Sequence, residues 1–479
     1  MQYNRIWDII EINKLKNGGI DMNLNDSILK DKKHIHFIGI GGSGMYPLAQ
    51  ILHAQGYYLS GSDNNPTDTV EKVRSLGIPV TIGQRAENIK GADLIVHTAA
   101  ILPDNEELVA AKQSGVPVLE RSDLLGILTT HFQNTICISG THGKTTTSAM
   151  LTQIMLEADT DPTVVLGGKL KAIDGSGRIG KSEHMICESC EFEDHFLKLS
   201  PDIAVILNID EDHMEYFHTL DNLIASFTKF AQKATKTIIY HGDDKNSCEA
   251  VKTLNQKKVT FGFDSHNDYY PENITQQQGV HMTFDLMKRS EKQTTIDLYV
   301  PGKHNILNAC AACAAALESG VSTKQLQIGM AHFKGAGRRF EVLYHNHGIT
   351  VVDDYAHHPA EIQVTLQAAK SMDYQRVIAI HQPFTYSRTA RLLDDFAKVL
   401  QIADMVVLSE IMGSREKNTL QIYTKDLAKK IPDCIWYPEF TEIADYVASI
   451  AQEGDIIITL GCGDVNKCAH LIIERLKNR

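Results

Sequence analysis

A glycine-rich segment at residues 139–146 has the residue types that bind phosphate groups. It reads Ser-Gly-Thr-His-Gly-Lys-Thr-Thr, directly after the apolar run 134–138 and directly before a helical pattern. In such a turn, backbone N–H groups converge on phosphate oxygens, a lysine reaches the terminal phosphates, and a threonine hydroxyl binds Mg²⁺. Lys144 and Thr145 are predicted to perform the last two tasks. The residues predicted to bind ATP in this segment are Gly140, Thr141, His142, Gly143, Lys144, Thr145 and Thr146.

A second glycine loop lies near the beginning of the chain. Gly39, Gly41 and Gly44 follow a short run of β-forming residues and precede a helical pattern, and Asp63 follows the next predicted strand. This pattern is typical of a dinucleotide-binding turn, in which glycines permit close approach of a diphosphate and an acid binds a ribose hydroxyl. Two such loops predict two phosphorylated ligands, or one such ligand together with ATP. That combination disfavours a plain dehydrogenase.

Acidic and histidine side chains follow several predicted strands, where open α/β sheets build their sites. Carboxylates near a triphosphate suit Mg²⁺, and a histidine ligand is less usual for that ion. Asn305 and Asn308 lie one turn apart and so share a helix face. Arg388, after the run 376–380, is a candidate clamp for a carboxylate. The strand-end candidates are Glu188, Asp210, Asp212 and His213 in the central part, and Asp353, Asp354, His357 and His358 further on.

Strand and helix patterns alternate along three successive blocks, which indicates βαβ units and parallel sheets. We predict an α/β protein of three domains, each built on a mostly parallel sheet flanked by helices. The first would be Rossmann-like, the second of P-loop type and the third again Rossmann-like. The expected parts are a tail at 1–33, with Met22 as an alternative translation start, and domains at 34–130, 131–337 and 338–479.

The composition excludes several classes of protein. A formal net charge of −12 disfavours a nucleic-acid scaffold. No apolar run approaches the roughly 18 residues of a membrane span, and no secretory signal is visible, so we expect a cytoplasmic protein without membrane insertion. The nine cysteines are scattered without zinc-site spacing, and we expect reduced thiols and no structural zinc.

The spaced set of motifs resembles one family, the ATP-dependent Mur ligases of peptidoglycan synthesis, and within it the alanine-adding members. The resemblance extends from Lys33 to the end of the chain. It implies that L-alanine is joined to the lactyl carboxylate of UDP-N-acetylmuramate through an acyl phosphate, with ATP and Mg²⁺. The motifs are HIHFIGIGGSGM, SGSD, SGTHGKTTT, NIDEDHMEYF, PGKHNILNA, FKGAGRRFE, DDYAHHPAEI and QPxxYSRT, where x marks a position that does not carry the resemblance.

The resemblance also implies roles for individual residues. The UDP part of the substrate would be bound by Gly39, Gly41, Gly42, Ser43, Gly44 and Asp63, with His97 and Thr98 close by. The metal ligands would be Thr145, Glu188 and His213. Asn305, Asn308, Arg339 and Asp354 would contact ATP. Lys144, His357, His358 and Arg388 would act in catalysis, the last three facing the amino acid.

Two segments depart from the pattern of alanine-adding relatives. Phe384 and Thr385 replace a His-Arg pair, and the run 189–193 reads Ser-Cys-Glu-Phe-Glu in place of Ala-Asp-Glu-Ser-Asp. The alternatives are a tripeptide-recycling or glutamate-adding Mur ligase, a nucleotide-dependent dehydrogenase using the first loop for NAD, and a non-catalytic nucleotide sensor. We expect no nucleic-acid partner, and a monomer or weak homodimer.

Overall fold

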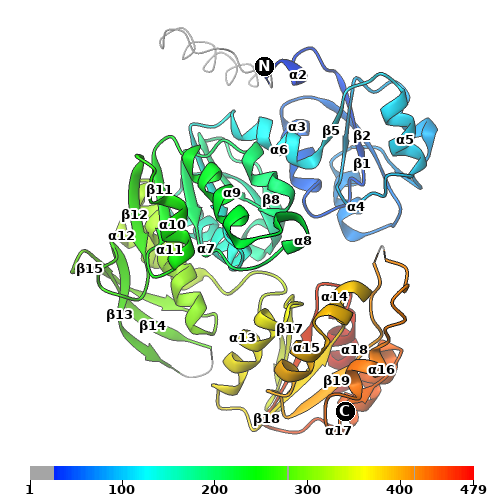
Figure 1. Ribbon diagram of the computed structural model, residues 1–479, viewed down its shortest axis with the longest axis vertical. Coiled ribbons are helices and arrows are strands. Elements are labelled where there is room, and N and C mark those ends of the chain that lie inside the picture. Colours follow the sequence, from blue (N-terminus) through cyan, green and yellow to red (C-terminus); the bar gives the residue numbers. More distant parts are fainter. Residues whose placement is uncertain (1–25, 278–279, 415) are drawn as a thin grey trace. The chain divides into compact units, whose positions relative to one another are not determined.

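The computed structural model describes residues 26–277, 280–414 and 416–479, which form three β-sheets, each with helices beside it (Figure 1). Mostly parallel sheets flanked by helices confirm the predicted α/β class. Met22, the predicted alternative start, lies outside the described residues, as does most of the predicted tail 1–33. No helix in the described part of the chain has the length and apolar character needed to cross a membrane.

The first sheet has five parallel strands in the order β3-β2-β1-β4-β5. Four of the five residues of its central strand are buried, as expected for a strand covered on both faces. The strand order reverses between β1 and β4, and such sheets bind ligands at that point. Its strands are β1 (His34–Ile38), β2 (Tyr58–Asp63), β3 (Val80–Ile82), β4 (Leu94–His97) and β5 (Val118–Glu120), and its helical segments are α2 (Asp26–Leu29), α3 (Tyr46–Ala54), α4 (Asp68–Ser75), η1 (Ala86–Ile89), α5 (Glu106–Gln113) and α6 (Arg121–Thr129).

The second sheet has ten strands in the order β15-β14-β13-β12-β11-β10-β6-β9-β7-β8. Its parallel centre extends from β12 to β7, while β13, β14 and β15 form an antiparallel ribbon that the sequence analysis did not predict. The strands are β6 (Asn134–Ser139), β7 (Thr163–Leu170), β8 (Gly175–Arg178), β9 (His184–Glu188), β10 (Ile203–Ile206), β11 (Thr237–His241), β12 (Lys257–Phe261), β13 (Tyr269–Gln276), β14 (Met282–Lys288) and β15 (Glu291–Leu298).

Helices α7, α11 and α12 contribute much of the core of this second sheet. The alanine and cysteine side chains of α11 are small enough for close packing, and Cys310 and Cys313 are fully buried among apolar groups. The helical segments are α7 (Lys144–Glu157), η2 (Lys171–Ile173), η3 (Phe192–Lys198), α8 (Met214–Phe217), α9 (Leu220–Gln232), α10 (Lys245–Val251), α11 (Lys303–Glu318) and α12 (Thr323–His332).

The third sheet has the order β16-β17-β21-β18-β19-β20, and only the β16–β17 pair is antiparallel. Neighbouring residues of β17 point to opposite faces, so Val352 joins the core beneath α13 and α15 and Val351 the core beneath α17 and α18. The elements are β16 (Glu341–Asn346), β17 (Ile349–Asp354), α13 (Pro359–Lys370), β18 (Arg376–His381), α14 (Tyr386–Arg391), α15 (Leu393–Leu400), β19 (Met405–Leu408), α16 (Thr424–Ala428), β20 (Ile435–Trp436), α17 (Phe440–Ile450), β21 (Asp455–Leu460) and α18 (Asn466–Lys477).

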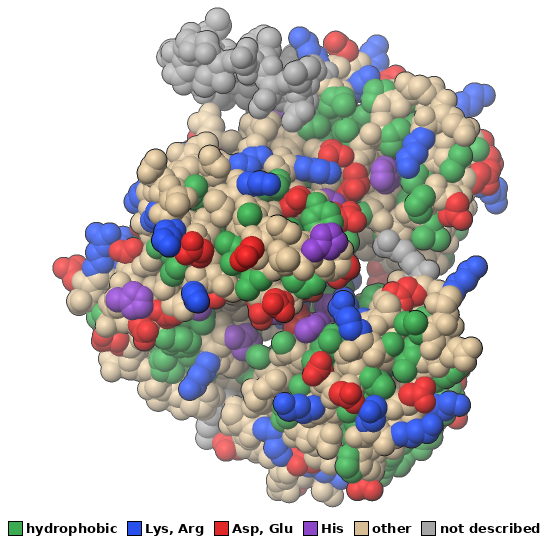
Figure 2. All heavy atoms as spheres, in the orientation of Figure 1, with side chains coloured by type: hydrophobic (Ala, Val, Ile, Leu, Met, Phe, Trp, Pro, Cys, Tyr) green, Lys and Arg blue, Asp and Glu red, His purple; other side chains and the backbone are tan. Residues whose placement is uncertain are grey.

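The charged side chains are mixed in sign over the surface that Figure 2 draws. Lysine and arginine alternate with aspartate and glutamate there, and the described residues of that face form no continuous basic surface. This distribution agrees with the net negative charge of the sequence.

Candidate active site

The loop between β6 and α7 is fixed by the chain that follows β10. The backbone N–H of His142 donates to Asn208 Oδ1 at 2.8 Å, and Asn208 Nδ2 donates back to the carbonyl of His142 at 3.0 Å. The N–H of Asp210 donates to Thr141 Oγ1 at 2.9 Å. Gly143 caps α7 with a left-handed φ of +86°, a conformation that residues with a Cβ disfavour. The loop is therefore held at the carboxyl ends of two neighbouring parallel strands.

Lys144, the first residue of α7, is paired with a buried carboxylate. Its Nζ donates to Glu191 Oε2 at 2.9 Å and to the carbonyl of Thr141 at 3.1 Å, and the Glu191 side chain is only 2% exposed. Burial by itself lowers the pKa of Lys144, but the charge and hydrogen bond of Glu191, together with the other acidic groups nearby, more than offset burial and raise the pKa above its ordinary value. Lys144 is thus a fully charged cation beside the glycine loop.

Thr145 and Glu188 form a second polar pair at this loop. The Thr145 hydroxyl donates to Glu188 Oε1 at 3.0 Å, and the N–H of Gly167 donates to Glu188 Oε2 at 2.8 Å. A Cβ on Gly167 would lie 2.5 Å from Glu188 Oε1, so the glycine leaves room for the carboxylate. Hydroxyl and carboxylate oxygens are ligands that Mg²⁺ prefers.

A third cluster consists of Glu191, Asp212 and His213. Each offers one ligand atom, and the three atoms lie within 4.8 Å of one another. His213 has a left-handed φ of 55°, and its N–H donates to Asp212 Oδ1 at 2.8 Å. Burial acts to raise the pKa of Asp212, but the charge and N–H of His213 more than offset it, so the pKa is lowered. The cluster therefore combines two carboxylates and an imidazole, which fits a divalent cation.

Asn305 and Asn308 lie on the first two turns of α11, close to the glycine loop. Asn308 Nδ2 donates to Asn305 Oδ1 at 2.9 Å, and Asn305 Nδ2 donates to the carbonyl of Pro301 at 2.6 Å. A Cβ on Gly143 would lie 2.4 Å from Asn308 Oδ1. Neither asparagine caps the helix, because Gly302 occupies that position.

Asp354 ends β17 and organises the chain on both sides of that strand. Its carboxylate accepts the N–H of Phe340 at 2.7 Å and the N–H of Ala356 at 2.8 Å. Burial raises its pKa to about 6, against the opposing positive charge of Arg339. The guanidinium of Arg339 lies 5.1 Å from the centre of the Tyr355 ring. Asp354 thereby connects the start of the third sheet to the histidine segment.

His357 and His358 precede α13 and share one carboxylate. Their N–H groups donate to Glu361 Oε2 at 3.1 and 3.3 Å, and His357 Nδ1 lies 3.3 Å from the same oxygen. Burial acts to raise the pKa of Glu361, but His357, which is protonated in the acidic range where Glu361 titrates, and Arg339 lower it to about 2. Burial lowers the pKa of both histidines, so both are neutral near pH 7. Within the described chain, His358 Nδ1 is buried without a hydrogen-bond partner.

Arg388 lies in α14, one turn after the segment that departs from the family pattern. Thr385 begins this helix with a left-handed φ of 63°, and its Oγ1 accepts the N–H of Arg388 at 3.4 Å. The N–H of Thr385 donates to the carbonyl of Met412 at 2.9 Å, and Phe384 pairs with the same residue. The positive charge of Arg388 adds to the effect of burial in lowering the pKa of His357.

The first glycine loop is bonded to Asp63. The N–H of Gly41 donates to Asp63 Oδ2 at 2.9 Å, and the N–H of Asn65 donates to Asp63 Oδ1 at 3.2 Å. A Cβ on Gly39 would lie 2.7 Å from Thr98 Cγ2, and His97 Nδ1 lies 3.1 Å from the carbonyl of Thr98. Asp63 and Thr98 therefore contact this loop, and His97 precedes Thr98 at the end of β4.

A buried network of polar side chains stabilises the position of the same loop. Glu107 is fully buried, with His36 Nε2 2.7 Å from its Oε1 and the Ser62 hydroxyl donating to Oε2 at 2.7 Å. The carbonyl of Ser62 accepts the N–H groups of Gly39 and Ile40 at 2.8 and 3.0 Å. Burying a carboxylate is costly unless it is fully bonded, so this network fixes the end of β2 against the glycine loop.

Comparison with known proteins places the chain in a family. Family models match residues 34–133 (Mur ligase family, catalytic domain), 138–316 (Mur ligase middle domain) and 338–463 (Mur ligase, glutamate ligase domain). The UDP-N-acetylmuramate–L-alanine ligase of Clostridium botulinum strain Langeland is 43% identical over 453 residues, which are 93% of this chain and 99% of the relative. The chain belongs to the Mur ligase family.

Other relatives agree with this placement. The UDP-N-acetylmuramate–L-alanine ligase of Agathobacter rectalis is 43% identical to this Mur ligase over 92% of the chain and 98% of the relative. Among solved structures, UDP-N-acetylmuramate-alanine ligase MurC from Thermotoga maritima has a TM-score of 0.81 and 28% identity, and the match covers 93% of this chain and 99% of that one.

The structure of this Mur ligase brings the predicted metal ligands together in two groups, one of which includes a residue that was not predicted. Thr145 lies with Glu188, and His213 lies with Asp212 and Glu191. Glu191 was missed as a functional residue, although it is an acid shortly after a buried strand, the signal that selected Glu188. Glu361 was missed as well, because its bonding to the two histidines depends on the turn into α13.

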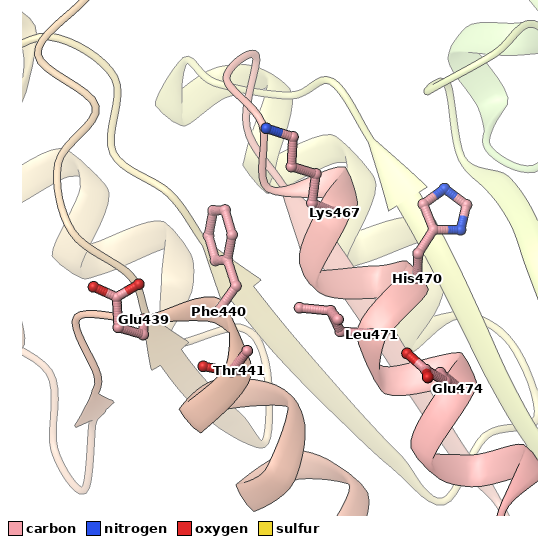
Figure 3. A pocket seen from close by; sticks show the side chains of 7 residues that line it. All are labelled: Glu439, Phe440, Thr441, Lys467, His470, Leu471 and Glu474. Carbon is pink, nitrogen blue, oxygen red and sulfur yellow. The ribbon is translucent and has the colours of Figure 1, made fainter.

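A cavity of about 470 Å³ lies between α17 and α18 of this Mur ligase (Figure 3). Phe440 and Leu471 form its apolar part, and Lys467, His470 and Glu474 project from α18 around it. None of the predicted site residues lines it, so we assign it no part in the candidate site.

Proposed function

We propose that the protein joins L-alanine to the lactyl carboxylate of UDP-N-acetylmuramate, giving UDP-N-acetylmuramoyl-L-alanine, ADP and phosphate for peptidoglycan synthesis. The observation that carries this proposal is the 43% identity to a UDP-N-acetylmuramate–L-alanine ligase over 99% of that relative's length. The glycine loop with its charged Lys144 supports it, because a dehydrogenase has no use for such a loop.

Each domain would supply one part of the reaction. Residues 34–130 would bind the UDP-linked substrate, residues 131–337 would bind ATP, and residues 338–479 would bind the amino acid. In the central domain, Gly140 to Thr146 would surround the phosphates, with Asn305 and Asn308 close to the same loop. Arg339, from the segment that leads into the third sheet, and Asp354, at the end of β17, would contact ATP.

The chemistry requires that an unreactive carboxylate be activated. Phosphoryl transfer from ATP would convert the lactyl carboxylate to an acyl phosphate, and Lys144 would offset negative charge on the transferring group. The amine of L-alanine would then attack the acyl carbon, expelling phosphate and leaving an amide. Because His357 and His358 have lowered pKa values, each is neutral near pH 7 and able to accept the proton that the amine loses. Arg388 would bind the carboxylate of L-alanine.

The residues present fit Mg²⁺. Thr145 with Glu188, and His213 with Glu191 and Asp212, are the groups that would hold it, since they offer mostly oxygen ligands beside the loop. When bound, Mg²⁺ would neutralise charge on the phosphates. The same proposal extends to the setting of the reaction: a cytoplasmic enzyme that is a monomer or weak homodimer.

Phosphate release is the assay that tests the reaction. With ATP, Mg²⁺ and UDP-N-acetylmuramate, we expect rapid phosphate release on addition of L-alanine and little with D-glutamate or the tripeptide of recycling ligases. Phosphate release that is equally fast without UDP-N-acetylmuramate, or an absorbance change with NAD in its place, would contradict the proposal.

The metal ligands are tested by a Mg²⁺ titration of that assay. His213→Ala should raise the Mg²⁺ concentration needed for half-maximal rate, because the cluster loses one of its three ligand groups. His218→Ala removes an exposed histidine from the same segment and should leave the titration unchanged. An unchanged titration in His213→Ala would remove His213 from the metal site.

A further inference from the structure

The residues predicted to bind the UDP-linked substrate at the first glycine loop include no lysine or arginine. A UDP-linked substrate carries a diphosphate with two negative charges, and the carboxylate of Asp63 already lies on this loop, bonded to the N–H of Gly41. The N–H of Gly42 is also occupied, because it donates to the carbonyl of Gly39 at 3.1 Å. A diphosphate placed here would meet an acid and few free donors, so a positive side chain is needed.

We propose that Arg121 is this cation and binds the diphosphate of the UDP-linked substrate, an inference that rests on the proposed function. Arg121 directly follows β5 and is the first residue of α6, so it lies at the carboxyl end of the parallel sheet, where the glycine loop also lies. A Cβ on Gly44 would lie 3.0 Å from Arg121 Cδ, 3.3 Å from Nε and 3.4 Å from one terminal nitrogen. The guanidinium therefore rests against the loop, in space that Gly44 leaves open.

The guanidinium is available for a ligand. Across the described residues its side chain makes no hydrogen bond or ion pair, whereas Arg74 of α4 is paired with Glu71 at 2.7 Å. Its acidic neighbours bond elsewhere: Asp123 Oδ2 accepts the N–H of Glu120 at 3.0 Å, and Glu120 Oε1 accepts the hydroxyl of Ser122 at 2.7 Å. An arginine fork binds two phosphate oxygens at once, which suits a diphosphate.

The position of Arg121 in its helix supports the same conclusion. The amino end of a helix carries partial positive charge, so a cation as the first residue is electrostatically unfavourable. Asp123 in the first turn offsets part of the helix dipole, but it forms no ion pair with Arg121 in the described chain. A bound diphosphate would give the guanidinium a direct ionic partner, which accounts for an arginine at this end of the helix.

Binding measurements on the full chain test the proposal. In isothermal titration calorimetry, Arg121→Ala should weaken UDP-N-acetylmuramate and UDP by about 10- to 100-fold, the range for a lost charge-assisted hydrogen bond. The affinity for uridine, which has no phosphate, should stay unchanged, as should that for a non-hydrolysable ATP analogue. Arg121→Lys keeps the positive charge but cannot bind two phosphate oxygens at once, so its affinity for UDP should lie between those of the wild type and Arg121→Ala. Arg85→Ala, which removes an exposed arginine between β3 and η1, is the control and should bind all ligands normally.

The outcomes separate this proposal from the proposed function. If the wild-type protein binds and consumes UDP-N-acetylmuramate but Arg121→Ala binds UDP as tightly as the wild type, Arg121 has no such role. If Arg121→Ala lost affinity for uridine and for UDP equally, the proposal would also be overturned, because such a loss would indicate a structural defect and not a lost phosphate contact. If Arg121→Ala does not fold, Arg121→Lys provides the test. A ratio of UDP affinity to uridine affinity as high as in the wild type would contradict the proposal, and a lower ratio would support it. A wild-type protein that binds no UDP-linked sugar would refute the proposed function itself.

Discussion

At the scale of single residues, the ion pair between Lys144 and Glu191 should contribute to both the activity and the stability of the protein. Lys144→Met should abolish measurable phosphate release, a loss of at least about 10²-fold, because the cation that offsets charge on the transferring group is gone. It should also destabilise the protein by about 3–5 kcal/mol, since Glu191 would remain buried without its partner. Thermal unfolding and phosphate release on the same samples measure the two effects.

The double variant Lys144→Met/Glu191→Gln is the control for this pair. With both charges removed, most of the lost stability should return while activity stays absent. Near-normal activity in Lys144→Met would contradict the assigned phosphate role. A double variant no more stable than the single one would show that the buried pair is not the source of the destabilisation.

The carboxylate of Glu361, which is bonded to His357 and His358, should make the stability of the protein depend on pH. Its pKa of about 2 lies below the ordinary 4.5, so its stabilising effect is complete above about pH 4.5 and is lost as the pH falls from there toward 2. Glu361→Gln should therefore destabilise the protein at pH 7 by up to about 3 kcal/mol, the upper range for hydrogen bonds to a charged group, because the N–H groups of His357 and His358 lose a charged acceptor. The melting temperatures of variant and wild type should converge as the pH falls below about 4.5. Glu442, an exposed glutamate that accepts a backbone N–H at the start of α17, is the matched control; Glu442→Gln should show no such convergence.

At the scale of elements, the turn from β6 into α7 depends on a glycine. Gly143→Ala should reduce ATP affinity strongly, because the new Cβ would lie 2.4 Å from Asn308 Oδ1 in a backbone of φ +86°. Gly320→Ala is a close control: its φ is +89° in the same domain, but its Cβ would meet nothing within 4 Å. Calorimetry with an ATP analogue should show a loss in the first variant alone. Equal losses in both would attribute the effect to backbone strain elsewhere in the fold.

The elements also show how far the sequence predicts this structure. Apolar runs before glycines and acids, as at 134–138 before Gly140, locate the parallel strands because buried strands need such runs. The ribbon β13–β15 was missed although Met282–Lys288 alternates buried and half-buried residues over most of its length, a detectable signal. Glu191 and Glu361 were missed for a different reason. Their contacts with Lys144 and the histidines join separate elements, and spacing within one element does not encode them.

At the scale of the whole molecule, the two glycine loops belong to two different sheets, β1 to α3 in the first and β6 to α7 in the second. Each loop is held by bonds from its own sheet, Asp63 in one and Asn208 in the other. The two nucleotides should therefore bind at separate sites. If both nucleotides bound at one site, one of the two glycine loops would bind no phosphate.

Competition between the nucleotides tests this separation. A saturating concentration of UDP-N-acetylmuramate should not displace a fluorescent ATP analogue, and Lys144→Met should lose the analogue while keeping the wild-type affinity for UDP-N-acetylmuramate. Gly41→Ala should show the converse, because its Cβ would lie 2.6 Å from Val70 and 2.9 Å from Asp63 and would distort the first loop alone. Mutual displacement of the two ligands would mean that one loop serves both, and the acid could not then be activated by a separately bound ATP.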